Sequence, residues 1–174
     1  MMARRDDAPP DLNDQIVALL PRLRRFCVVM ARSRDGGDDL CQATVERALS
    51  RRHLFDPGTR LDSWMYRIAQ NLHVDRARRV KTRGQEIDVD EMASVKGDDG
   101  VRIVEQRSAL ERARAAIARL PDDQRALMAL VVFDGKSYGE AAGLLDIPIG
   151  TVMSRLARAR RAIDAYVNGT DGNG

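Results

Sequence analysis

The sequence has few of the residues from which catalytic and metal centres are usually built. Among its 174 residues are two cysteines, Cys27 and Cys41, and two histidines, His53 and His73. No two of these four lie three or four positions apart, the spacing that a helical metal site uses, so we expect no metal and no other cofactor. Each cysteine stands among apolar residues, and we expect two free, buried thiols.

Long apolar segments are also absent. No stretch approaches the roughly twenty apolar residues that a membrane helix needs, and the start, MMARRDDAPPDL, lacks the apolar core of a signal peptide. We therefore expect a cytoplasmic protein without a membrane segment. Aromatic residues make up only 4% of the chain, against 44% for all hydrophobic residues. This balance favours aliphatic cores made by packed helices.

The charges are distributed unevenly along the chain. Lys and Arg number 29 and Asp and Glu 26, a net charge of only +3, yet an acidic run separates two basic clusters. Two separated basic surfaces predict two contacts with one polyanion. The first cluster consists of Arg76, Arg78, Arg79, Lys81 and Arg83, the acidic run of Glu86, Asp88, Asp90 and Glu91, and the second cluster of Arg155, Arg158, Arg160 and Arg161.

Periodic apolar residues predict an all-α protein of two small helical domains joined by a flexible acidic linker. Pro21 is expected to interrupt the first helix, and Asp35, Gly36 and Gly37 to form the turn before the second. Helices are predicted over residues 12–32, 38–52, 61–80, 103–120 and 122–133. The expected divisions are a disordered N-terminus at 1–11, a first domain at 12–80, the linker at 81–101, a second domain at 102–167 and a disordered tail at 168–174.

Residues 136–163 predict a helix-turn-helix at the end of the second domain. Ser137 and Glu140 form a capping box at the start of its first helix, and Pro148 prevents that helix from continuing past the turn. The outer face of the second helix carries arginines and short residues, which suits a helix lying in the major groove of DNA. Its buried stripe recurs at helical spacing and consists of Val152, Leu156, Ala159 and Ile163.

Two of the predicted helices in the first domain have one apolar side each. The later helix also has a polar side that combines positive charge with the amide of Asn71, next to a flexible loop. Trp64 could stack on a base, but its place in the apolar stripe favours a core role. The residues expected to be buried are Cys41, Val45, Ala48 and Leu49 in the earlier helix, and Leu61, Trp64, Met65, Ile68 and Leu72 in the later one.

Three segments, in this order and spacing, resemble the small, two-domain extracytoplasmic-function class of bacterial sigma factors. They are DDLCQATVERAL, LDSWMYRIAQNLHVDRARR and LPDDQRALMALVVFDGKSYGEAAGLLDIPIGTVMSRLARARRAI. The likeness extends over residues 19–166. It implies a subunit that binds RNA polymerase core, recognises a promoter and helps to open it, without enzymatic chemistry of its own.

The resemblance assigns the first of these segments to polymerase binding. In the family this helix docks on the clamp helices of the largest polymerase subunit. For any single residue the alternative is a solvated, acidic helix face. The residues of this chain that fall there are Asp38, Asp39, Leu40, Gln42, Thr44, Glu46 and Arg47.

The resemblance assigns the second segment and the loop before it to the −10 promoter element, where a base flipped out of the non-template strand is held. Asn71 matches the position beside this base, and its amide offers a donor and an acceptor to a Watson–Crick edge. The residues implied are Phe55, Asp56, Gly58, Thr59 and Arg60 in the loop, and Arg67, Asn71, Asp75, Arg76, Arg78 and Arg79 in the helix.

The third segment would place the second helix of the helix-turn-helix in the major groove of the −35 element. Met153 stands where arginine is common in the family, and Ala157 where a larger residue is often found. We therefore do not expect the usual promoter consensus to apply. The residues implied in DNA binding are Gly150, Thr151, Met153, Ser154, Arg155, Ala157, Arg158 and Arg161.

Within the class, residues 46–79 resemble the general stress response sigma factors of alphaproteobacteria. This likeness implies an anti-sigma factor as a partner, beside RNA polymerase core and promoter DNA. Other subgroups use membrane-anchored anti-sigma factors, some of which bind zinc, and no feature of the sequence decides between these types.

A stand-alone helix-turn-helix regulator is the main alternative. As a dimer it would need a dimer interface and usually an effector domain, and neither is evident, so we expect a monomer when the protein is free. An antagonist that mimics a sigma factor would leave the two basic faces unexplained. A metal nuclease built on Asp38, Asp39 and Asp75 would lack an organised histidine or glycine-rich loop, so we expect no enzyme.

Overall fold

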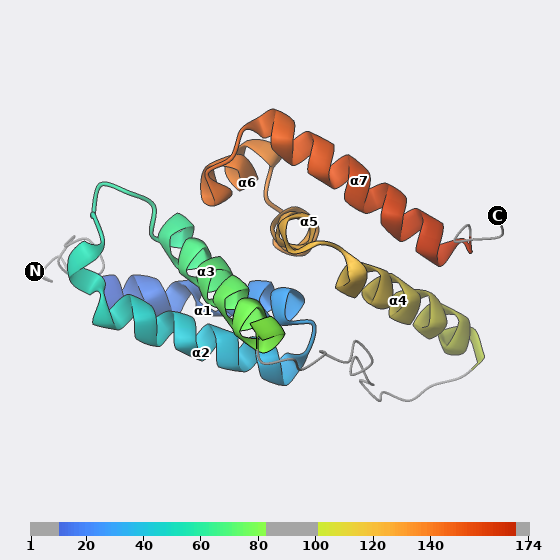
Figure 1. Cartoon of the computed structure of the whole chain (residues 1–174), viewed down its shortest axis with the longest axis horizontal. Coiled ribbons are helices and arrows are strands. Elements are labelled where there is room, and N and C mark those ends of the chain that lie inside the picture. The colour runs from blue at the N-terminus through green and yellow to red at the C-terminus, as the bar shows by residue number, and fades with distance from the viewer. Residues whose placement is uncertain (1–10, 83–100, 170–174) are drawn as a thin grey trace, which may run out of the picture.

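The computed structural model describes residues 11–82 and 101–169, and every regular element within these ranges is a helix. Linker residues 83–100 lie outside the described residues. So do the two ends that we expect to be disordered, except for Asp11 at the first and Asn168 and Gly169 at the second. The prediction of an all-α chain with two helical domains is confirmed. The first domain contains α1 (Leu12–Ala31), α2 (Arg34–Ser50), the short 3-10 turn η1 (Arg52–Leu54) and α3 (Leu61–Thr82). The second contains α4 (Val101–Arg119), α5 (Asp122–Met128), the π-helical turn η2 (Ala129–Phe133), α6 (Tyr138–Leu145) and α7 (Ile149–Val167) (Figure 1).

Helix α1 runs without a break through Pro21, so the predicted interruption is wrong. A proline inside a helix costs about 3 kcal/mol because it removes one backbone hydrogen bond and crowds the preceding turn. The buried stripe of α1, which includes Leu23 and Phe26, offsets this cost, since each such side chain contributes about 1.5–3 kcal/mol when buried. Asp11 caps the helix by accepting a hydrogen bond from the Leu12 amide at 2.8 Å.

Helix α2 begins earlier than the sequence indicates. The Ser33 hydroxyl accepts a hydrogen bond from the Gly36 amide at 3.1 Å and caps the helix, so Gly36 and Gly37 lie in its first turns and do not form a separate loop. Gly37 is buried against α1, where a Cβ atom would lie only 2.4 Å from the Cα atom of Val28. The glycine is therefore needed for the close packing of α1 and α2.

The predicted apolar stripe of α2 also needs correction. Leu49 is 42% exposed, whereas Leu40 is 1% exposed and fills the core position instead. Leu40 lies three positions after Gly37 and hence on the same side of α2, the side that packs against α1. In α3 the predicted Met65 is fully buried together with Tyr66, and the other four predicted core residues are partly buried.

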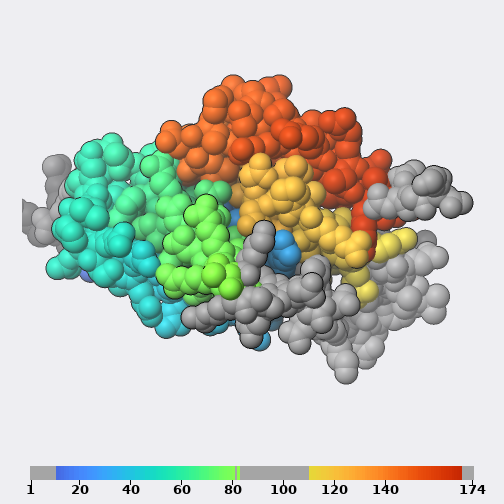
Figure 2. Space-filling view, viewed as in Figure 1, coloured from blue at the N-terminus to red at the C-terminus, as the bar shows by residue number. Residues whose placement is uncertain are grey.

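The two domains pack on each other (Figures 1 and 2). Their buried side chains form one continuous core. At the contact, the Asp134 carboxylate accepts hydrogen bonds from Arg22 and Arg25 of α1, each at 3.0 Å, and from the Tyr66 hydroxyl of α3 at 3.4 Å. We call these four residues the Asp134 cluster. The Asp134 side chain is only 7% exposed, and burial raises the pKa of Tyr66, with Asp134 adding to the effect. The two domains are thus packed against each other, and we call this the closed arrangement.

The helix-turn-helix has the predicted form. Ser137 and Glu140 make a reciprocal capping box around the start of α6, and the bonds to Ser137 lower the pKa of Glu140. Asp146 ends α6 in a left-handed conformation with φ of 54°, after which α7 begins directly behind Pro148. Val152, Leu156 and Ala159 are fully buried, as predicted.

Candidate nucleic-acid interface

A cavity of about 200 Å³ lies between the end of α2, η1 and α3. Asn71, Arg67 and Asp75 line it from α3, and Arg47 and Arg51 from the end of α2. The cavity therefore combines an amide, a carboxylate, guanidinium groups and an indole, a set that can hold an unstacked nucleobase and its phosphate. The other lining residues are Leu54, Trp64, Ile68 and Leu72.

The loop before α3 is folded against this cavity. The Phe55 ring packs on the Trp64 indole with ring centroids 5.1 Å apart. The Asp56 carboxylate accepts from the Gly58 amide at 2.8 Å, and its carbonyl accepts from the Thr59 amide at 2.9 Å. Asp56, Gly58 and Thr59 thus form a tight, exposed turn whose shape is set by its own hydrogen bonds.

Arg60 fixes the junction of this loop with α3. It donates two hydrogen bonds to the Asp62 carboxylate, at 3.1 and 2.9 Å. Burial alone would raise the pKa of Asp62, but the hydrogen bonds and charge of Arg60, the Ser63 amide and the charge of Arg22 together outweigh burial, and the pKa is lowered. The pair is therefore charged at neutral pH, and it anchors the loop.

The arginine side chains along α3 are exposed or make only weak contacts within the protein, so they are available to bind a polyanion. Arg78 and Arg79 are exposed, and Arg76 reaches the Asp39 carbonyl only at 3.4 Å. Arg67 lies 3.4 Å from the Asp146 carboxylate at the end of α6, but both side chains are more than half exposed. Because exposed ion pairs contribute little, a phosphate can displace this contact.

The outer face of α2 is polar and accessible. Asp39, Gln42 and Glu46 are exposed, and Gln42 donates to the Glu46 carboxylate at 2.9 Å. Asp38 accepts two bonds from Arg24, at 2.6 and 2.9 Å, and the bond from Arg24 lowers the pKa of Asp38. The face presents carboxylate and amide groups to solvent.

Two residues expected on this face are in the core. Leu40 is 1% exposed and Thr44 0% exposed, and the Thr44 hydroxyl donates to the Leu40 carbonyl at 2.7 Å. Their side chains are therefore not accessible on the outer face, and they stabilise the packing of α2. Arg47, assigned to the same face, lies at the cavity instead.

The outer face of α7 is arranged as the sequence predicts. Gly150 is exposed at its first turn and Thr151 is half-buried. Arg155 is half-buried and forms an ion pair with Asp123 of α5 at 2.9 Å, so it is held more firmly than the other arginines of this face. The exposed residues of the face are Met153, Ser154, Ala157, Arg158 and Arg161.

Sequence reasoning missed Arg51 and Leu54 as lining residues of the cavity. Arg51 follows Arg47 by four positions, the spacing that places two side chains on one helix face, so a signal existed. Leu54 lies in η1, a short turn that has no periodic apolar pattern, so its position at the cavity could not be predicted from the sequence. Trp64 combines both roles weighed for it, because it packs on Phe55 and also lines the cavity.

Within residues 11–82 and 101–169, no helix is long and apolar enough to cross a membrane. The same part of the chain holds no group of three or more side chains that could ligate a metal ion.

Comparison with known proteins gives two family matches, one in each domain. Residues 16–70 match the family described as the sigma2 domain of PhyR, and residues 110–163 match sigma-70 region 4. The sigma factor EcfG of Rhodopseudomonas palustris is 35% identical over 162 residues, which cover 92% of this chain and 88% of that protein. The chain belongs to the extracytoplasmic-function sigma factors.

Other relatives agree with this assignment. SigW of Bacillus subtilis, also of the extracytoplasmic-function class, is 30% identical over 82% of this chain and 81% of its own length. This sigma factor accordingly binds RNA polymerase and directs promoter-specific initiation, and it is similar to EcfG within the class. Nothing in the comparisons supports a stand-alone helix-turn-helix regulator.

Two solved structures share the fold. The sigma factor RpoE of Bartonella quintana, crystallised with the anti-sigma factor NepR, matches with a TM-score of 0.71 and 27% identity, covering 93% of this chain and 99% of that one. CnrH, solved with the cytosolic domain of CnrY, matches with a TM-score of 0.63 and 21% identity over 92% of this chain and 88% of that one.

Proposed function

We propose that this sigma factor reads the −10 element by holding one unstacked base of the non-template strand in the cavity beside Asn71. The observation that carries this proposal is the juxtaposition of the Asn71 amide, the Trp64 indole and three arginines around one small cavity. The amide can pair with the edge of a base, and the arginines can bind the flanking phosphates.

Promoter opening then requires no chemistry by the protein. Unstacking a base costs a few kcal/mol, and contacts in the cavity together with attraction to phosphates offset this cost. Phe55, Asp56, Gly58, Thr59 and Arg60 form the rim that meets the neighbouring bases, while Arg76, Arg78 and Arg79 follow the backbone. The sigma factor thus acts by binding and not as an enzyme.

The outer face of α7 meets the −35 element in the major groove. Ser154, Arg158 and Arg161 read base edges or phosphates there, and the short side chain of Ala157 allows the helix to come close. Gly150 and Thr151 bring the first turn of α7 near a phosphate. Met153, which is 55% exposed, offers an apolar contact to a thymine methyl group, and Arg155 supports the face through Asp123.

The polymerase docks on the exposed face of α2, where Asp38, Asp39, Gln42 and Glu46 lie. Leu40 and Thr44 hold this face in place from within the core. Both promoter surfaces belong to one chain, which acts as a monomer in the cytoplasm, where the polymerase and the chromosome meet.

An anti-sigma factor controls the protein. The solved RpoE of Bartonella quintana is bound to the anti-sigma factor NepR, which supports a protein inhibitor for this chain as well. The resemblance of residues 46–79 to the general stress response sigma factors supports a role in such a response.

The Asn71→Ala variant tests the cavity. We expect the variant to bind RNA polymerase core like the wild type but to lose open-complex formation, because the amide that holds the base is gone. Asn13→Ala is the matched control, since Asn13 is exposed at the start of α1 and bonds only within its own turn, to Asp11 at 3.1 Å. Unchanged promoter opening by Asn71→Ala, measured by the reactivity of unpaired thymines, would exclude the proposed role.

A further inference from the structure

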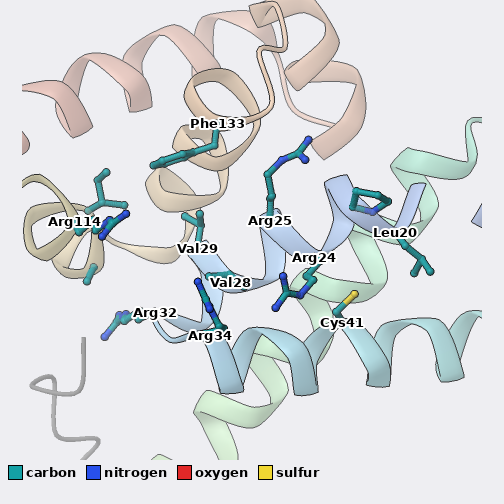
Figure 3. Close-up of a pocket in the computed structure, with 13 residues that line it drawn as sticks. Leu20, Arg24, Arg25, Val28, Val29, Arg32, Arg34, Cys41, Arg114 and Phe133 are labelled. Carbon is teal, nitrogen blue, oxygen red and sulfur yellow. The ribbon is translucent and has the colours of Figure 1, made fainter. Parts of the chain in front are cut away.

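A groove of about 810 Å³ is lined by α1 and α2 of the first domain and by α4 and η2 of the second. Its volume lies within the range of about 300–1,000 Å³ that is typical of small-molecule sites, which often form where domains meet. Val28 and Phe133 form part of the wall, and arginines reach toward it from α1, α2 and α4 (Figure 3). The groove therefore exists only while the domains are in the closed arrangement.

The wall of the groove is apolar apart from its arginines. The other lining residues among those that the structure describes carry hydrocarbon side chains, except for Cys41, whose thiol is a weak hydrogen-bonding group. A ligand with several polar edges, such as a nucleobase, would leave those edges without partners, and an unpaired buried polar group is unfavourable. The wall therefore suits a ligand with a hydrocarbon body.

Within the described parts of the chain, five arginines and no acidic side chain line the groove. Three of the five are paired with carboxylates that lie outside it. These pairs are Arg24 with Asp38 at 2.6 Å, Arg25 with Asp134 at 3.0 Å and Arg32 with Asp122 at 3.9 Å.

The remaining two arginines, Arg34 of α2 and Arg114 of α4, are exposed and form no ion pair with residues 11–82 or 110–169. Arg34 adds to the lowered pKa of Asp38, but that carboxylate is already bonded to Arg24 at 2.6 and 2.9 Å. Two guanidinium groups, one from each domain, thus lie beside an apolar wall without a bonded carboxylate. The planar guanidinium group matches the geometry of a carboxylate, so an anion with a hydrocarbon tail complements both features of the groove.

We propose that the groove binds a fatty acid, with its chain against the apolar wall and its carboxylate at Arg34 and Arg114. Such a molecule buries its chain without leaving polar groups unpaired, and its carboxylate accepts charge-assisted hydrogen bonds from the arginines. Because the walls belong to both domains, the bound acid links them and favours the closed arrangement by mass action. The site is separate from the cavity at Asn71 and from the outer face of α7, so it does not depend on how the promoter is read.

Titration of decanoate into the full-length chain, below the concentration at which the acid forms micelles, tests the site. Isothermal titration calorimetry should show saturable binding of one molecule per chain. The affinity should rise about threefold to fourfold for each added methylene group from octanoate to dodecanoate, because each group is buried against the wall. Uncharged decanol should bind at least about tenfold more weakly than decanoate. Equal binding of the acid and the alcohol would overturn the proposal, and so would the absence of saturable binding, which would leave the groove to a protein partner.

A double variant, Arg34→Gln with Arg114→Gln, removes both proposed contacts at exposed positions, where the fold does not depend on them. Its affinity for decanoate should fall at least about tenfold, while that for decanol should not change. Arg52→Gln is the matched control, because Arg52 is exposed at η1 and outside the groove, and it should bind decanoate like the wild type. Equal losses in the double variant and the control, or no loss in either, would contradict the assigned contacts.

Hydrogen exchange measured by mass spectrometry locates the bound acid. Saturating decanoate should slow amide exchange on both walls of the groove, in residues 20–34 and 114–133. Protection confined to residues 47–75, around the cavity at Asn71, would place the acid elsewhere and overturn the proposal. Protection of one wall alone would contradict a site shared by the two domains.

Discussion

The arginines of α7 differ in how firmly their side chains are held. Arg155 is paired with Asp123 at 2.9 Å, and Arg160 donates to the Tyr138 hydroxyl at the same distance. Arg158 and Arg161 reach carbonyls one turn back on their own helix only at 3.4 Å. The latter two guanidinium groups can therefore turn toward DNA at little cost, whereas the former two stabilise the fold around the helix.

Arg158→Ala is the residue-scale prediction. We expect it to weaken promoter binding by the complete polymerase by about 1–3 kcal/mol if Arg158 reads a base, and only on promoters that carry that base. Competition binding on a set of −35 variants measures this. Arg160→Ala, at the flank and tied to Tyr138, is the control and should have less effect. An equal loss on every sequence would make Arg158 a phosphate contact.

Among the elements, the α1–α2 pair shows how one small residue sets helix geometry. Gly37 allows the two backbones to touch, and this contact fixes the position of Cys41, of Leu40 and of the polar face of α2. The apolar period of α2 indicates a helix, but it does not show how closely the neighbouring helix approaches. Only the structure supplies this information.

Gly37→Ala is the prediction at this scale. The added methyl group would meet the backbone of Val28, so we expect a loss of about 1–3 kcal/mol in the free energy of unfolding. Gly139→Ala is the matched control: a Cβ atom at Gly139 would meet nothing within 4 Å, and the change should stabilise α6 by about 0.4–1 kcal/mol. Urea denaturation of both variants gives the comparison, and equal effects would show that the close contact is unimportant.

At the scale of the whole molecule, the Asp134 cluster and a second contact hold the domains together. His73 of α3 and Asp122 of α5 lie 3.2 Å apart, and this hydrogen bond lowers the pKa of Asp122. The contribution of a carboxyl with a lowered pKa is present above its usual pKa and disappears as the pH falls through the lowered value. The contribution of Asp122 to the closed arrangement should therefore be lost in acid.

Asp134→Asn should open this arrangement at neutral pH. The variant loses its charge-assisted bonds to Arg22 and Arg25, an effect of about 1–3 kcal/mol, while the shape of the side chain is kept. Small-angle X-ray scattering should show a larger radius of gyration. Asp164→Asn removes the same charge near the end of α7 and should leave the radius unchanged. A compact Asp134→Asn variant would show that apolar packing alone closes the molecule.

Sequence patterns were sufficient for the helices, the capping box and the outer face of α7, because each depends on residues within a few turns of one another. The closed arrangement depends on contacts between α1 and η2, which are more than a hundred residues apart. No local sequence pattern predicts these contacts. Pro21 and Leu40 were misjudged for the same reason: packing between helices decides whether a proline is tolerated and which side chain turns inward. Helical spacing from Arg47 could have predicted that Arg51 lines the cavity, but no sequence pattern could have predicted this for Leu54.

The most direct test of the central claim adds the purified, full-length chain to RNA polymerase core on genomic DNA and maps the 5′ ends of the transcripts. Our account predicts new starts that share two upstream elements at a constant spacing, one read by α7 and one by the cavity at Asn71. A distribution of starts identical to that of core polymerase alone would contradict it.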